Sequence, residues 1–213
     1  LHHITGKDIY FSPTDMGVNM VGYCIKNNDI VENAAKKEVV RRYFNELCNY
    51  KQGISDFDTV QKIKLLMNEL NIDENFLKVV EVSKKASEKK KTNVIALELP
   101  KGKIITGKQT DLLSPASSVI INAIKELSKI PDEINLLSPT ILEPILKLRK
   151  NNNTLSLQEV LIALAVCSVT NPSIASALEK LEVLKDCEAH ATYIVTNGDL
   201  KALKSLKINL TCE

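Results

Sequence analysis

The spacing of apolar residues changes near residue 92, and this change most constrains how the chain can fold. From about residue 29 to residue 91, apolar side chains recur every three or four positions, which predicts helices. After residue 92, apolar runs of strand length alternate with helical segments, and such alternation favours a sheet covered by helices. The sequence therefore predicts an α/β protein, with an N-terminal helical subdomain followed by a three-layer α/β/α domain.

The boundary between the two parts is expected at a lysine-rich run. Residues 1–91 are predicted to hold an extended segment and the helical subdomain, and residues 92–213 the α/β subdomain. Three helices should begin near Asp29, Ser55 and Asp73, because short polar side chains cap the free backbone N–H groups of a helix start. The third helix should end in the charged run 84–91, which is typical of a solvated helix end or a linker.

The second part shows a regular order of strand and helix signals. Residues 93–107 predict a β-hairpin. Ser114 and Ser138 each precede a proline, a residue favoured at the first position of a helix. Ser156 and Glu159 form a capping box, and the helix after them is apolar nearly all round, which predicts that it is buried. Further elements are expected as a short strand at 134–137, a helix from 171 to about 184, and strands at 189–195 and 208–210.

The segment from Ser12 to Ile25, S-P-T-D-M-G-V-N-M-V-G-Y-C-I, is too polar for a core strand and too glycine-interrupted for a helix. Two interpretations of it stay open. It is a structural plug whose methionines and valines pack against the domain, or it contributes to a ligand-binding site. In the second case the candidate binding residues are Ser12, Thr14, Asp15 and Asn19.

A second group of candidate residues accompanies the end of the hairpin. Thr106, Lys108 and Asp111 lie where the chain leads into the first proline-started helix, and loops commonly carry binding residues. Ser114 and Ser138 permit two interpretations. Either a helix N-terminus holds an anion there, or each serine caps its own helix.

His190 is the remaining candidate. In a strand, Glu188, His190 and Thr192 share one face as a polar row, whereas Cys187 points to the other face, which disfavours a Cys–His nucleophilic pair. The alternative is a histidine that is satisfied within the fold or exposed on a strand.

Composition and motifs exclude several classes of function. The 28 basic and 26 acidic residues are scattered without a basic stripe, so neither nucleic acid nor a membrane surface is an expected partner. No apolar run approaches the roughly 18 residues of a membrane span. Five widely spaced cysteines indicate free thiols in a reducing cytoplasm. Neither a glycine-rich phosphate loop nor a Gly-x-Ser-x-Gly motif is present, and a single histidine beyond His2 and His3 supplies a zinc site poorly. We expect no cofactor and no metal in this chain.

Several blocks resemble a bacterial family known as domain of unknown function 1846. They include the segment from Ser12 to Ile25, P-K-G-K-I-I-T-G-K at 100–108 and N-L-T-C-E at 209–213, and the likeness extends over essentially the whole chain. The resemblance implies the C-terminal half of a longer protein, whose N-terminal half carries a P-loop-like segment. It also implies a cytidine-deaminase-like topology. Deaminases bind zinc at two helix starts, but here the starts at 114–118 and 138–142 contain no zinc ligand and no catalytic glutamate.

The sequence leaves two hypotheses about function. In the first, the chain contributes to a nucleotide- or phosphate-dependent enzyme whose P-loop-like segment lies in the other half of the family protein. In the second, it is a non-catalytic scaffold or oligomerisation module. The expected partners are the N-terminal half of the full-length protein and a second copy of the chain.

Overall fold

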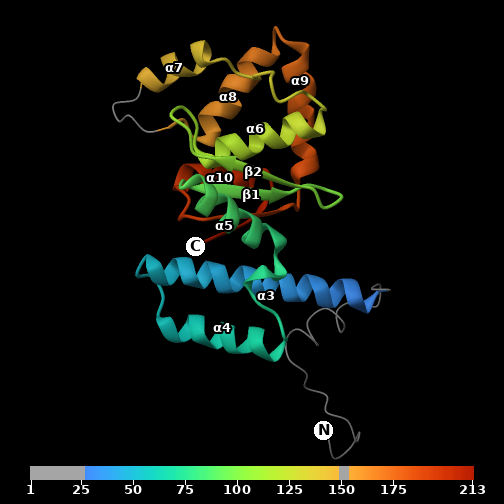
Figure 1. Ribbon diagram of the computed structural model, residues 1–213, viewed down its shortest axis with the longest axis vertical. Coiled ribbons are helices and arrows are strands. Elements are labelled where there is room, and N and C mark those ends of the chain that lie inside the picture. The colour runs from blue at the N-terminus through green and yellow to red at the C-terminus, as the bar shows by residue number, and fades with distance from the viewer. Residues whose placement is uncertain (1–26, 149–153) are drawn as a thin grey trace, which may run out of the picture. The chain divides into compact units, whose positions relative to one another are not determined.

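The computed structural model describes residues 27–148 and 154–213 (Figure 1). The chain divides into two compact units, Leu1–Phe76 and Leu77–Glu213. The candidates Ser12, Thr14, Asp15 and Asn19 lie outside the described residues, so the two interpretations of their segment stay predictions.

The first unit is helical, as predicted. Helix α3 (Asn28–Lys51) packs against α4 (Phe57–Glu69), and a short 3-10 turn η1 (Glu74–Phe76) follows. The side chain of Asn27 caps α3 by accepting a hydrogen bond from the backbone N–H of Ile30 at 3.2 Å. The carboxylate of Asp56 caps α4 in the same way, from the N–H of Thr59 at 2.8 Å. The core consists of aliphatic and aromatic side chains, among them Val40, Tyr43, Phe44, Val60 and Met67.

The third predicted helix belongs to the second unit. Helix α5 (Lys78–Lys90) buries Val79, Val80 and Ser83 completely and packs on the sheet, although its last turn is charged. The division of the chain therefore falls between Phe76 and Leu77, earlier than the expected boundary at residues 91 and 92. The lysine-rich run marks the exposed face of a sheet-covering helix, so its charge does not indicate a linker.

The second unit contains a four-stranded mixed sheet of order β2-β1-β3-β4. Strand β1 (Val94–Glu98) is antiparallel to β2 (Ile104–Lys108), which confirms the predicted hairpin. Strand β1 is also antiparallel to β3 (Glu188–Ala191), and β3 is parallel to β4 (Asn209–Cys212). Strand β3 ends at Ala191 and is therefore shorter than the predicted strand 189–195.

Helices cover both faces of this sheet (Figure 1). Helix α5 lies on one face and α6 (Pro115–Leu127) on the other. Beyond α6 lie α8 (Leu157–Ser168) and α9 (Pro172–Glu179), the second of which continues into the 3-10 helix η2 (Lys180–Leu184). The remaining α-helices among the described residues of this unit are α7 (Pro139–Lys147) and α10 (Asn197–Ser205). The main core lies between the sheet and the helices on the α6 side, as the buried side chains of Ile95, Leu97, Ile120, Leu164 and Leu203 show.

Two predictions about the second unit are wrong. Residues 134–137 form bends and irregular backbone in place of a strand, and Leu136 and Leu137 fill the core from that loop. Helix α8 has the predicted capping box but is buried on one side only, because Ile162, Val166 and Val169 are 65%, 67% and 84% exposed. An apolar helix surface is not by itself evidence of burial within the same chain.

The sheet and α6 are in direct backbone contact at Gly107, in the outer strand. A Cβ atom at this position would lie 2.1 Å from the backbone nitrogen of Val119 and 2.7 Å from the carbonyl oxygen of Pro115. The first turns of α6 therefore touch the backbone of β2, and only glycine permits this approach.

We predict that Gly107→Ala lowers the free energy of unfolding by at least about 1–3 kcal/mol, because the added methyl group collides with the backbone of α6. The matched control is Gly198→Ala, since nothing lies within 4 Å of a Cβ atom there. The control should keep or slightly raise stability. Chemical denaturation of both variants measures the difference, and equal stability of the two would contradict the assigned contact.

Candidate functional site beside the outer strand

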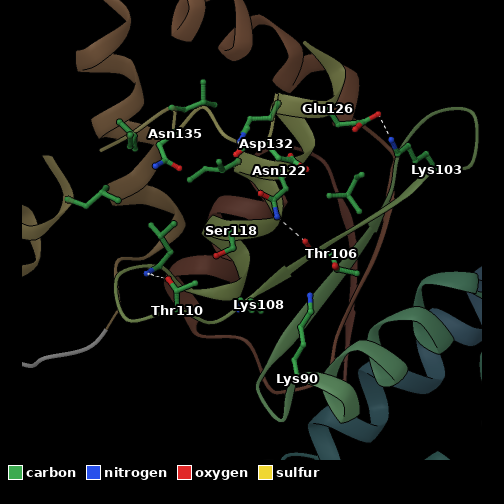
Figure 2. Close-up of a pocket in the computed structure, with 17 residues that line it drawn as sticks. Lys90, Lys103, Thr106, Lys108, Thr110, Ser118, Asn122, Glu126, Asp132 and Asn135 are labelled. Atoms are coloured by element: carbon green, nitrogen blue, oxygen red, sulfur yellow. Dashed lines mark hydrogen bonds and ion pairs between the residues drawn. The ribbon is translucent and has the colours of Figure 1, made fainter. Parts of the chain in front are cut away.

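A pocket of about 610 Å³ lies beside the outer strand of the sheet, and we call it the β2-edge pocket (Figure 2). Its walls come from β2, from one side of α6, from the loop between α6 and α7, and from the end of α5. Four lysines and two carboxylates line it: Lys90, Lys103, Lys108, Lys125, Glu126 and Asp132.

The backbone of β2 exposes hydrogen-bonding groups toward this pocket. In the hairpin, the backbone N–H of Leu99 donates to the carbonyl oxygen of Lys103 at 2.8 Å, and the N–H of Gln109 donates to that of Asn93 at 3.1 Å. Hydrogen-bonded and non-hydrogen-bonded pairs alternate along an antiparallel ladder, so these two bonds and the register show which pairs are of which kind. The intervening residue Thr106 therefore directs its N–H and C=O groups away from β1. Its carbonyl oxygen accepts a hydrogen bond from the Asn122 side chain at 3.0 Å, whereas no described residue accepts from its N–H. A backbone donor thus remains available at the edge of the sheet.

Lys125 is the most unusual residue of the pocket, because it is a cation with only 7% of its surface exposed. Its Nζ atom donates to the backbone carbonyl of Asp132 at 2.9 Å. None of the ion pairs found in residues 27–148 and 154–213 involves Lys125. Buried charges in proteins are normally paired, since desolvation of an unpaired charge is costly. The Lys125 ammonium group is an exception to this rule, because it has no counter-ion within the described chain.

Ser118 lies in the same helix and lines the same pocket. The residue is 8% exposed, and its Oγ atom is buried without a hydrogen-bond partner among the described residues. The neighbouring Ser114, by contrast, caps its own helix by accepting from the N–H of Ser117 at 3.2 Å, which confirms the capping interpretation for Ser114. A buried hydroxyl without a partner is uncommon in native proteins and points to a missing acceptor or donor.

The other lysines of the pocket differ in their pairing. Lys103 forms an ion pair with Glu126, which Figure 2 shows as a dashed line. Lys90 and Lys108 are exposed, and neither takes part in an ion pair with another described residue. The pocket thus contains three cationic side chains that no carboxylate of the described chain neutralises.

The structure brings only part of the predicted candidates together. Thr106 and Lys108 line the β2-edge pocket, whereas Asp111 is exposed and is not among its lining residues. Sequence reasoning missed Ser118, Asn122 and Lys125. A signal for two of them was present, since Asn122 and Lys125 are polar residues three positions apart within the apolar stretch that begins at Val119.

Glu188, His190 and Thr192 belong to a different place, on the face of the sheet that α5 covers. His190 is completely buried, so the alternative of an exposed histidine is wrong. Its Nδ1 atom lies 2.8 Å from the hydroxyl of Thr211, and its Nε2 atom lies 3.8 Å from a carboxylate oxygen of Glu213.

Glu213 also forms an ion pair with Lys84 at 3.0 Å. The facing His190 imidazole and the Lys84 ammonium lower the pKa of the Glu213 carboxyl from 4.5 to about 2, although burial acts in the opposite direction. This group of residues holds β3, β4 and α5 together.

We predict that Glu213→Gln lowers the free energy of unfolding at neutral pH by on the order of 1 kcal/mol, a value reduced by solvent screening of a partly exposed carboxylate. The pKa of the Glu213 carboxyl is lower in the folded than in the unfolded state. Its contribution to the free energy of unfolding is therefore complete above about pH 4.5 and is lost as the pH falls toward about 2. Denaturation curves of the wild type and the variant at several pH values measure this difference. Glu182→Gln, at an exposed site, is the control. A difference that stays constant between pH 7 and pH 3 would contradict the assignment.

The described part of the chain contains no group of three or more His, Cys, Asp or Glu residues placed to hold a metal ion. Its four described cysteines, Cys48, Cys167, Cys187 and Cys212, are free thiols. Among the helices in the described ranges, none combines the length and the hydropathy that a membrane span requires.

Comparison with known proteins identifies relatives over the full length of the chain. Residues 1–71 match the family model "Domain of unknown function DUF1846, N-terminal", and residues 75–213 match "Domain of unknown function DUF1846, C-terminal". A UPF0371 protein of Clostridium tetani is 42% identical over the whole chain, which spans 45% of that relative. UPF0371 proteins of Clostridium botulinum strain Alaska E43 and of Clostridioides difficile are 45% and 42% identical, again over the whole chain and 45% of the relative. The chain therefore belongs to the DUF1846 family.

Proposed function

We propose that the α/β unit binds a phosphate-bearing small molecule in the β2-edge pocket, as one part of a nucleotide- or phosphate-dependent enzyme. The observation that carries the proposal is Lys125, a cation that is 7% exposed and has no carboxylate partner in the described chain. An anion in the adjoining pocket supplies the missing counter-charge. The cost of burying the ammonium group in the free protein is then offset when the ligand binds.

The groups around Lys125 match the hydrogen-bonding capacity of a phosphate. A phosphate presents only acceptor oxygens, and the pocket presents donors: the ammonium of Lys125, the hydroxyl of Ser118 and the outward N–H of Thr106. The second N–H of the Asn122 amide adds a further donor. Charge-assisted hydrogen bonds of this kind are stronger than neutral ones.

The pocket supplies binding groups but no evident catalytic base. Its lining contains no histidine and no cysteine, and one of its two carboxylates, Glu126, already pairs with Lys103. The chain spans about half the length of the curated relatives that it matches. We propose that the remaining part of the family protein provides the reacting groups, while this unit positions the phosphate.

We predict that the chain binds inorganic phosphate with a Kd on the order of 1 mM, equivalent to about 4 kcal/mol. Lys125→Met should weaken binding at least tenfold, because it keeps the shape of the side chain but removes the charge. Lys204→Met, on an exposed site of α10 away from the pocket, should bind like the wild type.

Titration with phosphate, followed by amide NMR shifts, measures both the affinity and the location. The largest shifts are expected for residues of β2 and for the part of α6 from Ser118 to Lys125. Unchanged shifts at these residues in 20-fold excess over the expected Kd, or equal affinities of the wild type and Lys125→Met, would contradict the proposal. Thermal unfolding of each variant verifies that it remains folded.

A second candidate function rests on a different observation, the exposed apolar face of α7 and α8. Ile141, Ile145, Ile162 and Val166 line an apolar groove between these helices, with almost no polar atoms. We propose that the part of a full-length family protein outside this chain covers the groove, because the matched relatives are more than twice as long as the aligned region.

We predict that Ile162→Lys changes the stability of this chain by less than about 0.5 kcal/mol, since the side chain is 65% exposed. The same change at the equivalent position of the full-length Clostridium tetani relative should cost more than about 1 kcal/mol, because it buries a charge in an interface. Equal, small effects in both proteins would contradict the proposal. A dimer of this chain that Ile162→Lys dissociates would indicate a second copy in place of the remaining chain.

We also propose a finer assignment of the fold, a cytidine-deaminase-like topology without the zinc site. The hairpin of β1 and β2 followed at once by α6 across the sheet supports it. The starts of α6 and α7, at 114–118 and 138–142, contain no cysteine, histidine or glutamate.

We also propose a cytoplasmic location, which the free thiols of the described cysteines support.

A further inference from the structure

The cationic groups of the β2-edge pocket lie at two separate ends. In Figure 2, Lys90 and Lys108 lie in the lower part of the view, next to β2 and α5. Asp132 lies in the upper part, and its carbonyl oxygen holds the Nζ atom of Lys125 at 2.9 Å. Ser118 lies between the two ends. The unpaired positive charge is therefore divided between an outer pair of lysines and one inner lysine.

The two ends differ in their surroundings. The outer lysines are exposed, whereas Lys125 is held in one position by its hydrogen bond and by burial. A rigid, buried ammonium loses little side-chain entropy when a ligand binds, but a flexible exposed lysine loses more. A single anion bound at the inner end leaves Lys90 and Lys108 without a counter-charge. A single anion bound at the outer end leaves Lys125 without one.

The size and the remaining lining of the pocket fit a longer ligand. A volume of about 610 Å³ exceeds what one phosphate fills and lies within the range of small-molecule sites. The lining also includes aliphatic side chains, Ile105, Ile121 and Leu136, which can contact an uncharged middle part. No other described cationic side chain of the lining is unpaired, because Lys103 forms an ion pair with Glu126.

We propose that the β2-edge pocket binds a small molecule with two anionic groups, at least one of them a phosphate, joined by an uncharged core. One anionic group contacts Lys125 and Ser118, and the other contacts Lys90 and Lys108. This inference rests on the proposed function and specifies the ligand class of the same site. The class includes bisphosphorylated metabolites and metabolites with one phosphate and one carboxylate.

Linking the two anionic groups makes the second contact intramolecular, so affinity should rise well above that of a single phosphate. The probes are methyl phosphate, pyrophosphate and alkane-1,ω-diol bisphosphates with two to six carbon atoms. We expect at least one of the bisphosphates to bind ten times more tightly than methyl phosphate. Pyrophosphate, whose charges are adjacent, should show a smaller gain. Calorimetric titration of the wild-type chain measures each affinity at fixed ionic strength.

Variants separate the two ends of the pocket. Lys108→Gln should remove most of the bisphosphate gain, measured as the ratio of bisphosphate to methyl phosphate affinity in the same variant, because it removes one cation of the outer end. Lys125→Met should weaken both ligands. Lys204→Gln on α10 is the matched control for the loss of one lysine and should preserve the gain. Circular dichroism and thermal midpoints verify that each variant is folded.

The binding results distinguish this inference from the function on which it rests. Equal affinities of methyl phosphate and every bisphosphate would overturn the inference and leave phosphate binding intact. Retention of the full bisphosphate gain in Lys108→Gln would overturn the inference in the same way. If no probe binds at all, both the inference and the proposed function are wrong.

Discussion

The direct contact of α6 with the backbone of β2 at Gly107 is the constraint on which the rest of the second unit depends. Without a side chain at this position, the first turns of α6 lie against the outer strand of the sheet. Asn122 is then placed to bond the carbonyl of Thr106 at 3.0 Å, and Ser118 and Lys125 line the space beside the strand. An outer strand is normally a liability, because its free backbone groups pair with other chains. Here the amide of Asn122 and the neighbouring lysines protect it.

The same contact explains why a polar pocket exists beside a hydrophobic core. One side of α6 is mostly apolar, and its Ile120 and Ile124 are buried in the core. The other side turns toward the loop between α6 and α7, where Leu136 and Leu137 cover the core and Asp132 offers its carbonyl to Lys125. The loop therefore fixes the buried ammonium in the pocket wall. A cation held in this way costs stability in the free protein, and binding of an anion would offset that cost.

Much of the architecture follows from local sequence signals. The hairpin, the caps at Ser114 and Ser156 and the helical first unit have clear patterns, because they depend on residues close together in the chain. The charged run after Lys84 was a misleading signal for the domain boundary. Charge shows which face of a helix meets water, but it does not show whether the opposite face of that helix packs on a sheet. The apolar surface of α8 was misleading for a similar reason, because exposure depends on packing of the whole unit.

The site was less predictable than the fold. Thr106 and Lys108 were candidates, since they accompany the hairpin, but Lys125 was not, because its burial arises from tertiary packing against a loop and no spacing rule along the chain indicates it. Rare residues such as His190 draw attention in a sequence, whereas common residues in unusual surroundings become visible only in three dimensions.

Neutralisation of the buried Lys125 ammonium by an anion is the central claim about this protein. Crystals of the chain grown with selenate or tungstate, which resemble phosphate in charge and shape, test it most directly through anomalous scattering. We expect an anomalous peak in the β2-edge pocket, with anion oxygens within hydrogen-bond distance of Lys125 Nζ and Ser118 Oγ. Ordered anions elsewhere on the molecule, together with a pocket that holds only water at Lys125, would contradict the claim.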